Sequence, residues 1–310
     1  MKRIITFILI LFFTQEIYAQ QVYQLTHYMI NDFAFNPAVA GSDDTFVGKA
    51  SFRKQWSGID GAPTTGMVSM HGNLSENRTV GIGAILYSDN TGPIGRTGAT
   101  LAYAYQLPLV ENETYLGIGV GANLMSYKIN FNELITRDEG DPQIGAGDQS
   151  KMGADANLGL YLKGLNFWAG LSVNQMFASK YTFVGDVESI ENSRHIFLGG
   201  GVTFNASENL DIAPSILLKS VAGAGAQFEL GARAIVNKNY WAGISYRTED
   251  ALAILVGLQL DSSLNLAYSY DITTSDLSNY TSGTHEITVG YNFDFFNRKA
   301  KKSIPSDDIE

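Results

Sequence analysis

The chain has 310 residues and a formal net charge of −10; 45% of its residues are hydrophobic and only 17% are charged. A disordered chain is excluded, because such chains combine high charge with few aromatic residues, and here 12% of the residues are aromatic. An acidic chain whose basic residues cluster only at 298–302 is also a poor candidate for binding nucleic acid. The absence of cysteine excludes thiol catalysis, zinc–thiolate sites and disulfides.

Residues 1–19 have the pattern of a secretory signal peptide. Lys2 and Arg3 precede an apolar run over residues 4–13, and Ala19 provides a small residue at the expected cleavage position. The alternative is an N-terminal membrane anchor, but that run is shorter than the ~20 residues that a spanning helix needs. No uncharged apolar run after residue 20 approaches that length either. We therefore expect an exported protein without helical membrane spans.

Residues 20–44 form a separate N-terminal segment that does not alternate cleanly between apolar and polar side chains. It is too apolar for a free tail, because residues such as Tyr28, Met29, Phe33 and Phe35 need burial. We therefore expect this segment to pack against the rest of the chain.

Residues 45–296 are predicted to form repeated β-strands of about ten residues. In the segment 251–261, for example, Leu252, Ile254 and Val256 share one face. Such alternation is typical of a strand with one apolar and one polar face. Fourteen segments are predicted: 45–56, 64–73, 78–88, 95–107, 113–127, 152–163, 166–175, 193–205, 210–220, 225–236, 239–248, 251–261, 263–271 and 284–296.

The connections between these segments alternate in length. Those at one end are short, whereas the long ones, 128–151, 176–192 and 272–283 among them, lie at the other end, where two connections are short. A soluble sandwich has no reason for this asymmetry, but an outer-membrane barrel has short periplasmic turns and longer outer loops. The strands also match the ~9–11 residues of a tilted spanning strand. The predicted fold is all-β: a transmembrane barrel of about 14 antiparallel strands in the bacterial outer membrane.

In such a barrel the apolar faces point to lipid and the polar faces to the lumen. The mixed charges of the polar faces indicate either an internal ion-pair network or an ordinary polar lining. Aromatic side chains near strand ends, such as Tyr87 and Tyr127, fit interfacial girdles. A barrel of this size also encloses space that its own side chains do not fill, so we expect residues 20–44 to enter the lumen from the periplasmic side as a plug. The charged lumen candidates are Lys49, Arg53, Asp155, Lys163, Glu229, Arg233, Arg247, Glu286 and Asp294.

The last predicted strand carries Gly290, Phe293 and Phe295. Their spacing is similar to the polar–x–Gly–x–x–aromatic–x–aromatic signal that the barrel-assembly machinery reads in outer-membrane barrels. Residues 297–310 follow as a tail that is first basic and then acidic, and we expect it to be solvated in the periplasm.

A more specific family resemblance lies in residues 24–65. This region contains Asn36-Pro37-Ala38-x-Ala40-Gly41, then Arg53-Lys54-Gln55-Trp56, and then Gly61-Ala62-Pro63. The pattern resembles the N-terminal signature of the PorP/SprF family, outer-membrane proteins of the type IX secretion and gliding machinery of Bacteroidetes. Lys54 stands where the family usually has Asn or a similar residue. The signature residues carried over are Asn36, Pro37, Ala38, Gly41, Arg53, Gln55, Trp56 and Pro63.

The resemblance implies a protein that supports secretion or cell-surface anchoring of cargo such as gliding adhesins. Its partners would be outer-membrane lipid, type IX secretion components and a large secreted cargo protein bound at the outer loops. The alternative is a FadL-like or porin-like transporter of small molecules, since residues 36–38 also resemble the hatch segment of FadL-type barrels. A fold-level analogy of this kind is weak support for a function.

The residues give no motif for catalysis or a bound cofactor, so no enzyme is expected. The four histidines have no metal-ligand spacing, and no helix pattern follows the glycine run Gly117-x-Gly119-x-Gly121, which instead indicates close packing or contact with a plug. Acidic residues crowd the loop 128–151, where oxygen ligands could bind Ca²⁺ or a partner. Solvation of that loop is the other reading, because like charges repel. These acidic residues are Asp138, Glu139, Asp141 and Asp148.

Overall fold

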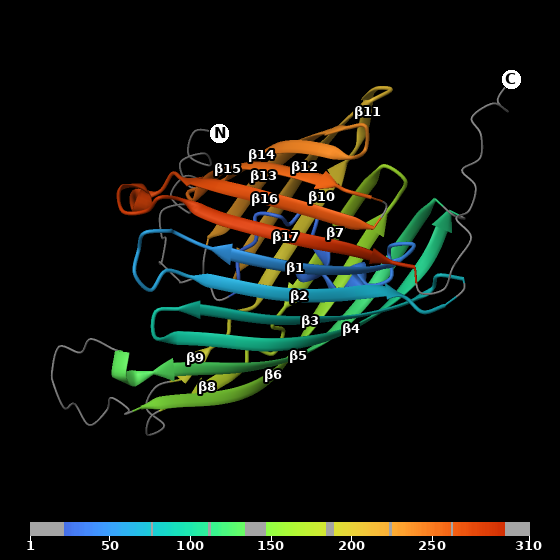
Figure 1. Cartoon of the computed structure of the whole chain (residues 1–310). Helices are drawn as coiled ribbons and strands as arrows, with labels where there is room; N and C mark the ends of the chain where they lie inside the picture. The colour runs from blue at the N-terminus through green and yellow to red at the C-terminus, as the bar shows by residue number, and fades with distance from the viewer. Residues whose placement is uncertain are drawn as a thin grey trace, which may run out of the picture.

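The computed structural model describes residues 22–75, 77–110, 113–133, 147–183, 189–222, 225–261 and 263–294. Its strands form one closed antiparallel barrel, seen from the side in Figure 1. The ring runs from β1 to β7, continues through β10 and then from β12 to β17, which makes fourteen strands. It closes because β10 pairs with both β7 and β12, while β1 pairs with both β2 and β17. The predicted fold class is therefore confirmed.

The ring strands agree closely with the predicted segments. They are β1 (Phe46–Lys54), β2 (Thr64–Asn73), β3 (Val80–Thr91), β4 (Ile94–Val110), β5 (Thr114–Asn130), β6 (Asp148–Lys163), β7 (Phe167–Asn174), β10 (His195–Val202), β12 (Leu210–Val221), β13 (Ala226–Val236), β14 (Tyr240–Arg247), β15 (Ala251–Gln259), β16 (Leu264–Thr273) and β17 (Thr284–Phe293).

Several smaller elements complete the fold. The strand β11 (Phe204–Ser207) follows β10 and pairs with β12, while β8 (Lys180–Thr182) and β9 (Ser189–Glu191) form a separate hairpin. Among the described residues, no helix is long and apolar enough to cross a membrane. The short helices are 3₁₀: η1 (Asp32–Ala34), η2 (Pro37–Val39), η3 (Phe131–Glu133) and η4 (Asp276–Asn279).

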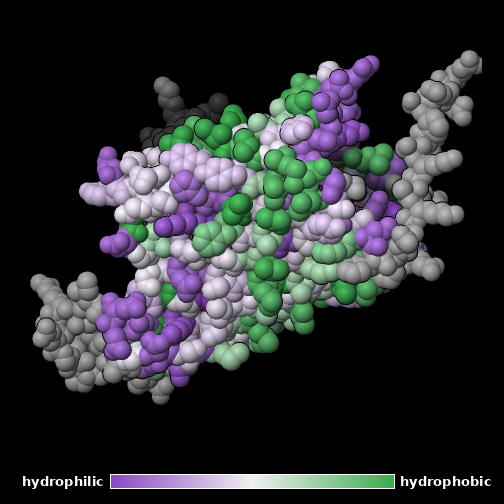
Figure 2. All heavy atoms as spheres, viewed as in Figure 1, coloured by the Kyte–Doolittle hydropathy of each residue, from purple (hydrophilic) through white to green (hydrophobic). Residues whose placement is uncertain are grey.

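The strand alternation separates an apolar outer surface from a polar lumen. Leu101 is 68% exposed and Ile244 is 60% exposed, whereas Arg53 is only 2% exposed. On the face in Figure 2, apolar side chains run across the middle of the barrel and hydrophilic ones gather toward its ends. Lipid contacts the apolar outer surface of such a barrel, and each strand of the ring pairs with two neighbours, so none of the fourteen is an edge strand. Two side chains assigned to interfacial girdles belong elsewhere, since Tyr127 is buried and Tyr87 is half-buried against a buried cluster.

The two ends of the barrel differ. The turns at 164–166 and 237–239 are short, and they lie at the end that we call periplasmic, following the rule for outer-membrane barrels. The connections at 55–63 and 274–283 belong to the opposite, outer end. In Figure 1 the outer end is on the left.

The barrel wall is uneven at the outer end. β4 and β5 each have 17 residues and β6 has 16, but the neighbouring β7 has only eight. β7 consequently pairs only with Leu158–Lys163 of β6. Further out, single contacts replace the strand: the Met176 N–H donates to the carbonyl of Ala156 at 3.0 Å.

Candidate functional site

The lumen contains the segment Val22–Gly41, which we call the inner segment. Most of its apolar side chains are almost fully buried: Leu25 and Phe33 are each 1% exposed. The segment carries the helices η1 and η2 and lies within the ring of strands, shown in blue in Figure 1. The barrel wall thus covers the apolar residues of this segment, which is too apolar for a free tail.

The Asn36-Pro37-Ala38 motif forms a tightly bonded turn inside the barrel. The Asn36 Oδ1 accepts a hydrogen bond of 2.9 Å from the Ala38 N–H, which caps the start of η2, and Pro37 occupies the first helical position, where no donor is needed. The Asn36 Nδ2 donates to the carbonyl of Leu160 at 2.9 Å. One side chain therefore both shapes the turn and fastens it to β6.

Glycines on the barrel wall make room for this turn. A Cβ on Gly119 of β5 would collide with the backbone of Pro37 and Ala38, and one on Gly81 of β3 would collide with the carbonyl of Ala40. The glycine run around residue 119 therefore lies where two backbones approach closely. Of the two roles expected for these glycines, close packing and contact with a plug, Gly119 has the second.

Gln106 of β4 holds the same turn from the other side. Its Nε2 donates to the carbonyl of Ala38 at 2.9 Å and to the carbonyl of Ala40 at 2.7 Å. Gln106 is 2% exposed and both alanines are fully buried, so water does not replace these bonds.

Replacing Gln106 by leucine is expected to loosen the inner segment while leaving the barrel closed. The change leaves two buried carbonyls without a donor, at about 1–3 kcal/mol for each. Hydrogen exchange of the inner segment should accelerate by one to several orders of magnitude in the variant. Gln227→Leu, at a half-exposed position on β13, is the matched control. Equal exchange in the two variants would contradict the role of Gln106.

A second set of contacts is a buried charge network of two arginines and three carboxylates. The Arg53 guanidinium lies 2.9 Å from Asp271 and 3.1 Å from Glu286, and the Arg247 Nε lies 2.9 Å from Glu229. Arg247 also reaches Asp271 at 3.4 Å, which joins the two halves. All five side chains are at most 3% exposed. Of the two readings of the lumen charges, the ion-pair network is therefore correct.

Thr26 ties the inner segment into this network. Its hydroxyl donates to Asp271 at 2.7 Å and accepts from Arg53 at 2.7 Å and from Arg247 at 3.0 Å, while its N–H donates to Glu286 at 2.7 Å. A single threonine therefore bonds four charged groups that come from four different strands.

His27 lies next to Thr26 and is fully buried. Burial lowers the pKa of His27 and outweighs the opposing charge of Glu286. The ring is therefore neutral near pH 7, and its Nδ1 lies 2.8 Å from the Thr288 hydroxyl. Its 3.2 Å approach to Glu286 is a polar contact between a neutral ring and a carboxylate.

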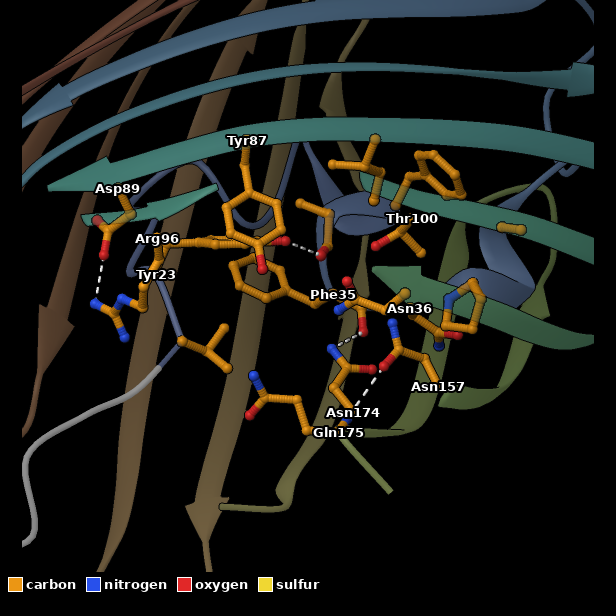
Figure 3. A pocket seen from close by; sticks show the side chains of 17 residues that line it. Tyr23, Phe35, Asn36, Tyr87, Asp89, Arg96, Thr100, Asn157, Asn174 and Gln175 are labelled. Carbon is orange, nitrogen blue, oxygen red and sulfur yellow. Dashed lines mark hydrogen bonds and ion pairs between the residues drawn. The ribbon is translucent and has the colours of Figure 1, made fainter. Parts of the chain in front are cut away.

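Little space remains on the other side of the inner segment. Figure 3 shows Tyr23 close to Tyr87 from β3, and the two ring centroids are 5.0 Å apart. The Tyr23 hydroxyl donates to the carbonyl of Ala34 at 2.8 Å, and Arg96 pairs with Asp89 beside them. The cavity on this side of the inner segment is about 30 Å³. That volume holds a water molecule or two, so it offers no room for an organic solute.

The signature residues fall into separate places. Asn36, Pro37, Ala38 and Gly41 belong to the inner segment, and Arg53 belongs to the charge network. The other three lie at the outer rim, where the Gln55 N–H donates to the carbonyl of Pro63 at 2.9 Å and the Trp56 N–H donates to Thr284 at 3.0 Å. The signature residues thus contribute both to contacts inside the lumen and to a turn at the outer rim.

The remaining candidate residues do not form one site. Gly290 and Phe293 lie on β17, where Phe293 packs against Tyr291 with ring centroids 4.7 Å apart, and Phe295 lies outside the described residues. Asp148 pairs with the exposed Lys128 at 2.5 Å, whereas Asp138, Glu139 and Asp141 also lie outside the described residues. Within the described ranges no group of three or more acidic or histidine side chains could hold a metal ion.

The sequence patterns did not identify three residues that make central contacts to the inner segment or the network: Thr26, Gln106 and Asp271. A polar residue in a lumen-facing position is the only signal that marks them, and many strand positions share it. By contrast, Arg247 and Glu229 were among the lumen candidates, and their direct pairing across β13 and β14 follows once the register is known.

Three comparisons place the chain among known proteins. A family model described as "Type IX secretion system membrane protein PorP/SprF" matches residues 17–291. No match was found among curated protein sequences.

Solved structures share the barrel architecture. The "TodX deltaS2S3 mutant monoaromatic hydrocarbon channel" is similar with a TM-score of 0.50 and 12% identity, over 88% of this chain and 95% of that chain. A Pseudomonas aeruginosa FadL homologue gives 0.49 and 10% identity, over 84% and 93% of the two chains. The Acinetobacter baumannii outer membrane protein Omp33 gives 0.46 and 9% identity, over 80% and 98%. At these identities the likeness concerns the fold alone.

Proposed function

Because the chain belongs to the PorP/SprF family of type IX secretion system membrane proteins, we propose that it supports the secretion or surface anchoring of a large cargo protein. In this proposal the barrel is a rigid anchor in the outer membrane, without catalytic activity, and cargo binds at its outer end. Binding sites commonly lie on loops held by a rigid scaffold, which is the arrangement of the outer connections here.

The observation that carries this proposal is that the inner segment blocks the lumen. The inner segment is bonded to β6 through Asn36, to β4 through Gln106 and to the charge network through Thr26. The cavity beside Tyr23 and Tyr87 is only about 30 Å³. A lumen blocked by so many buried contacts favours work done at the ends of the barrel over transport through it, so the inner segment acts as a plug.

The uneven wall offers a specific place for cargo. Among the described residues, no strand pairs with Asp148–Gly153 of β6 on the side of β7. The carbonyls of Ala154 and Ala156 point to that side, since they accept from Ser179 and Met176. Because strand residues alternate, the backbone N–H and C=O of Met152 also point there. An unpaired edge of this kind binds an added strand from a partner protein.

Replacing Met152 by proline is expected to abolish cargo capture without harming the barrel. Proline removes one N–H from the open edge, while the hydrogen bonds between β5 and β6 stay intact. The full-length protein, extracted in mild detergent, would be used for co-purification and mass spectrometry. We expect one large secreted protein with the unchanged chain and with Met152→Ala, and at least a tenfold loss with Met152→Pro.

Two other outcomes separate the alternatives. Recovery of barrel-assembly factors alone, with every variant, would remove the main support for cargo binding. Stable single-channel conductance of the unchanged protein in planar bilayers would instead favour FadL-like or porin-like transport, which at present is supported only by likeness of fold.

A further inference from the structure

A cavity of about 640 Å³ lies at the periplasmic end of the barrel, on the opposite side of the inner segment from Tyr23. Ile30 of the inner segment, the linker residues Asp43 and Asp44, and the inner faces of several strands line it. Its volume falls within the ~300–1,000 Å³ of ordinary ligand sites. Cargo binding at the outer end, as proposed above, does not involve this cavity.

The charges that line this cavity are mostly positive, although the chain as a whole is acidic. Its cations are Lys49, Lys163, Arg233 and Lys238, and its only carboxylates among the described residues are those of Asp43 and Asp44. A local excess of positive charge inside a low-dielectric wall attracts anions.

Both carboxylates are already engaged. The Asp43 Oδ1 lies 2.5 Å from the Lys163 Nζ, and Asp44 pairs with Arg78. Burial alone would raise the pKa of Asp43, but the charges of Lys163 and His71 outweigh it and hold that pKa below its usual range. Asp43 is therefore ionised and hydrogen-bonded to Lys163. The carboxyl groups of Asp43 and Asp32 also lie near enough to act on Lys49, and Asp32 acts on Arg233, but among the described residues neither carboxyl group forms an ion pair with these two cations.

Besides Lys238 in the exposed turn, the cations that remain are Lys49 and Arg233. Neither forms an ion pair with any residue of the described ranges, and both are half-buried. Among the acceptors that the structure describes, the Lys49 ammonium donates only to the carbonyl of Ile30. The Arg233 guanidinium stacks 5.3 Å from the centre of the Trp241 ring, and its Nε is buried without a hydrogen-bond partner. Charges removed from water in this way are costly unless an opposite charge reaches them.

We propose that this cavity binds an acidic peptide segment, whose carboxylates pair with Lys49 and Arg233. A guanidinium binds a carboxylate through two parallel hydrogen bonds, and the Arg233 Nε provides a donor for one of them. The amide side chains of Gln259, Asn265 and Asn292 also line the cavity and suit the backbone of a peptide. Lys238, in the exposed turn between β13 and β14, adds a third positive charge.

Two sources have this chemistry. One is the chain itself, since Asp307, Asp308 and Glu310 lie in its C-terminal region, outside the described residues. Thirteen residues lead from Asp294 to Asp307, and Asn292 already lines the cavity. At ~3.3 Å per residue, that length spans about 43 Å when extended, which is ample to reach back. The other source is an acidic segment of a separate periplasmic protein.

The test measures binding of a fluorescein-labelled peptide, Ser-Asp-Asp-Ile-Glu, by anisotropy in detergent micelles. The full chain is compared with a chain shortened after Asn297, and the neutral peptide Ser-Asn-Asn-Ile-Gln is the probe control. We expect the shortened chain to bind the acidic peptide at least tenfold more tightly than the neutral one. Lys49→Gln and Arg233→Gln should each weaken that binding about tenfold.

Matched variants keep the test decisive. Lys54→Gln removes a positive charge from the exposed outer end of the same strand as Lys49, and it should leave binding unchanged. If Arg233→Gln does not fold, Lys238→Gln in the exposed turn should still weaken binding several-fold. Weaker binding to the full chain than to the shortened one identifies the chain's own acidic region as the ligand, and equal binding identifies a separate partner. Failure of the shortened chain to bind, or equal binding of the neutral peptide, would overturn the proposal.

Discussion

Replacing Arg53 by methionine is expected to destabilise the barrel by about 3–5 kcal/mol, the usual cost of breaking a buried ion pair from one side. Methionine has a similar length, so the loss is one of charge and hydrogen bonds rather than of volume. The Arg53 guanidinium bonds Thr26, Asp271 and Glu286 at 2.7 to 3.1 Å. Arg247 still reaches Asp271 in the variant, but Glu286 loses the one arginine that pairs with it among the described residues.

Denaturant unfolding in detergent micelles, followed by tryptophan fluorescence, measures this loss. Lys54→Met is the control, because Lys54 is the next residue of β1 and its side chain is exposed. The double change Arg53→Met with Glu286→Gln should recover part of the stability, since the uncompensated carboxylate is then gone. A variant within about 0.5 kcal/mol of the Lys54 control, the range of an ordinary surface substitution, would show that the network is not structural.

Replacing Gly119 by valine is expected to expel the inner segment and open the lumen. The new side chain would meet the backbone of Ala38 and the Pro37 carbonyl carbon, which lies 2.6 Å from the Cβ position. A backbone held by caps and buried hydrogen bonds cannot rotate aside as a flexible side chain does. The turn at residues 36–38 must therefore leave its position, and it takes the contacts of Gln106 with it.

Single-channel recording and limited proteolysis detect this opening together. The unchanged protein should be closed and its residues 22–41 protected, whereas the Gly119→Val variant should conduct and be cleaved in that segment. Gly66→Val is the control, because a Cβ on Gly66 of β2 meets nothing within 4 Å. Protection of the segment in the Gly119 variant would contradict the close approach of the two backbones.

The strands could be predicted because lipid and lumen impose opposite chemistry on alternate residues. Segment 64–73 became β2 with the same bounds, and segment 251–261 became β15 over Ala251–Gln259. The connections between strands were harder to predict than the strands themselves. The predicted connection at 89–94 shrank to Gly92-Pro93 because β3 and β4 extend beyond the membrane-sized part of the barrel, where alternation no longer reports on lipid. The hairpin of β8 and β9 lies in a stretch predicted as a loop.

Side chains that suit more than one environment were also hard to place from the sequence. Tyr127 fits an interfacial girdle by its place near a strand end, yet it packs against Tyr181 with ring centroids 5.7 Å apart. Tyr181 belongs to the β8–β9 hairpin, whose position depends on contacts far apart in the sequence. Aromatic composition therefore predicts that such residues find an apolar or interfacial place, but not which one.

Sequence patterns alone predict the barrel, its strand number, its outer-membrane location and the need to bury residues 20–44. These properties follow from period-two alternation and from local motifs, and each is contained within a few neighbouring residues. The contacts inside the lumen, by contrast, follow from the tertiary structure. Three of the four charged partners of Thr26 lie at least 221 residues away in the sequence, and the strand register places Ala213 and Gly243 beside Arg233. Such contacts depend on how the closed sheet brings distant strands together, which no local pattern records.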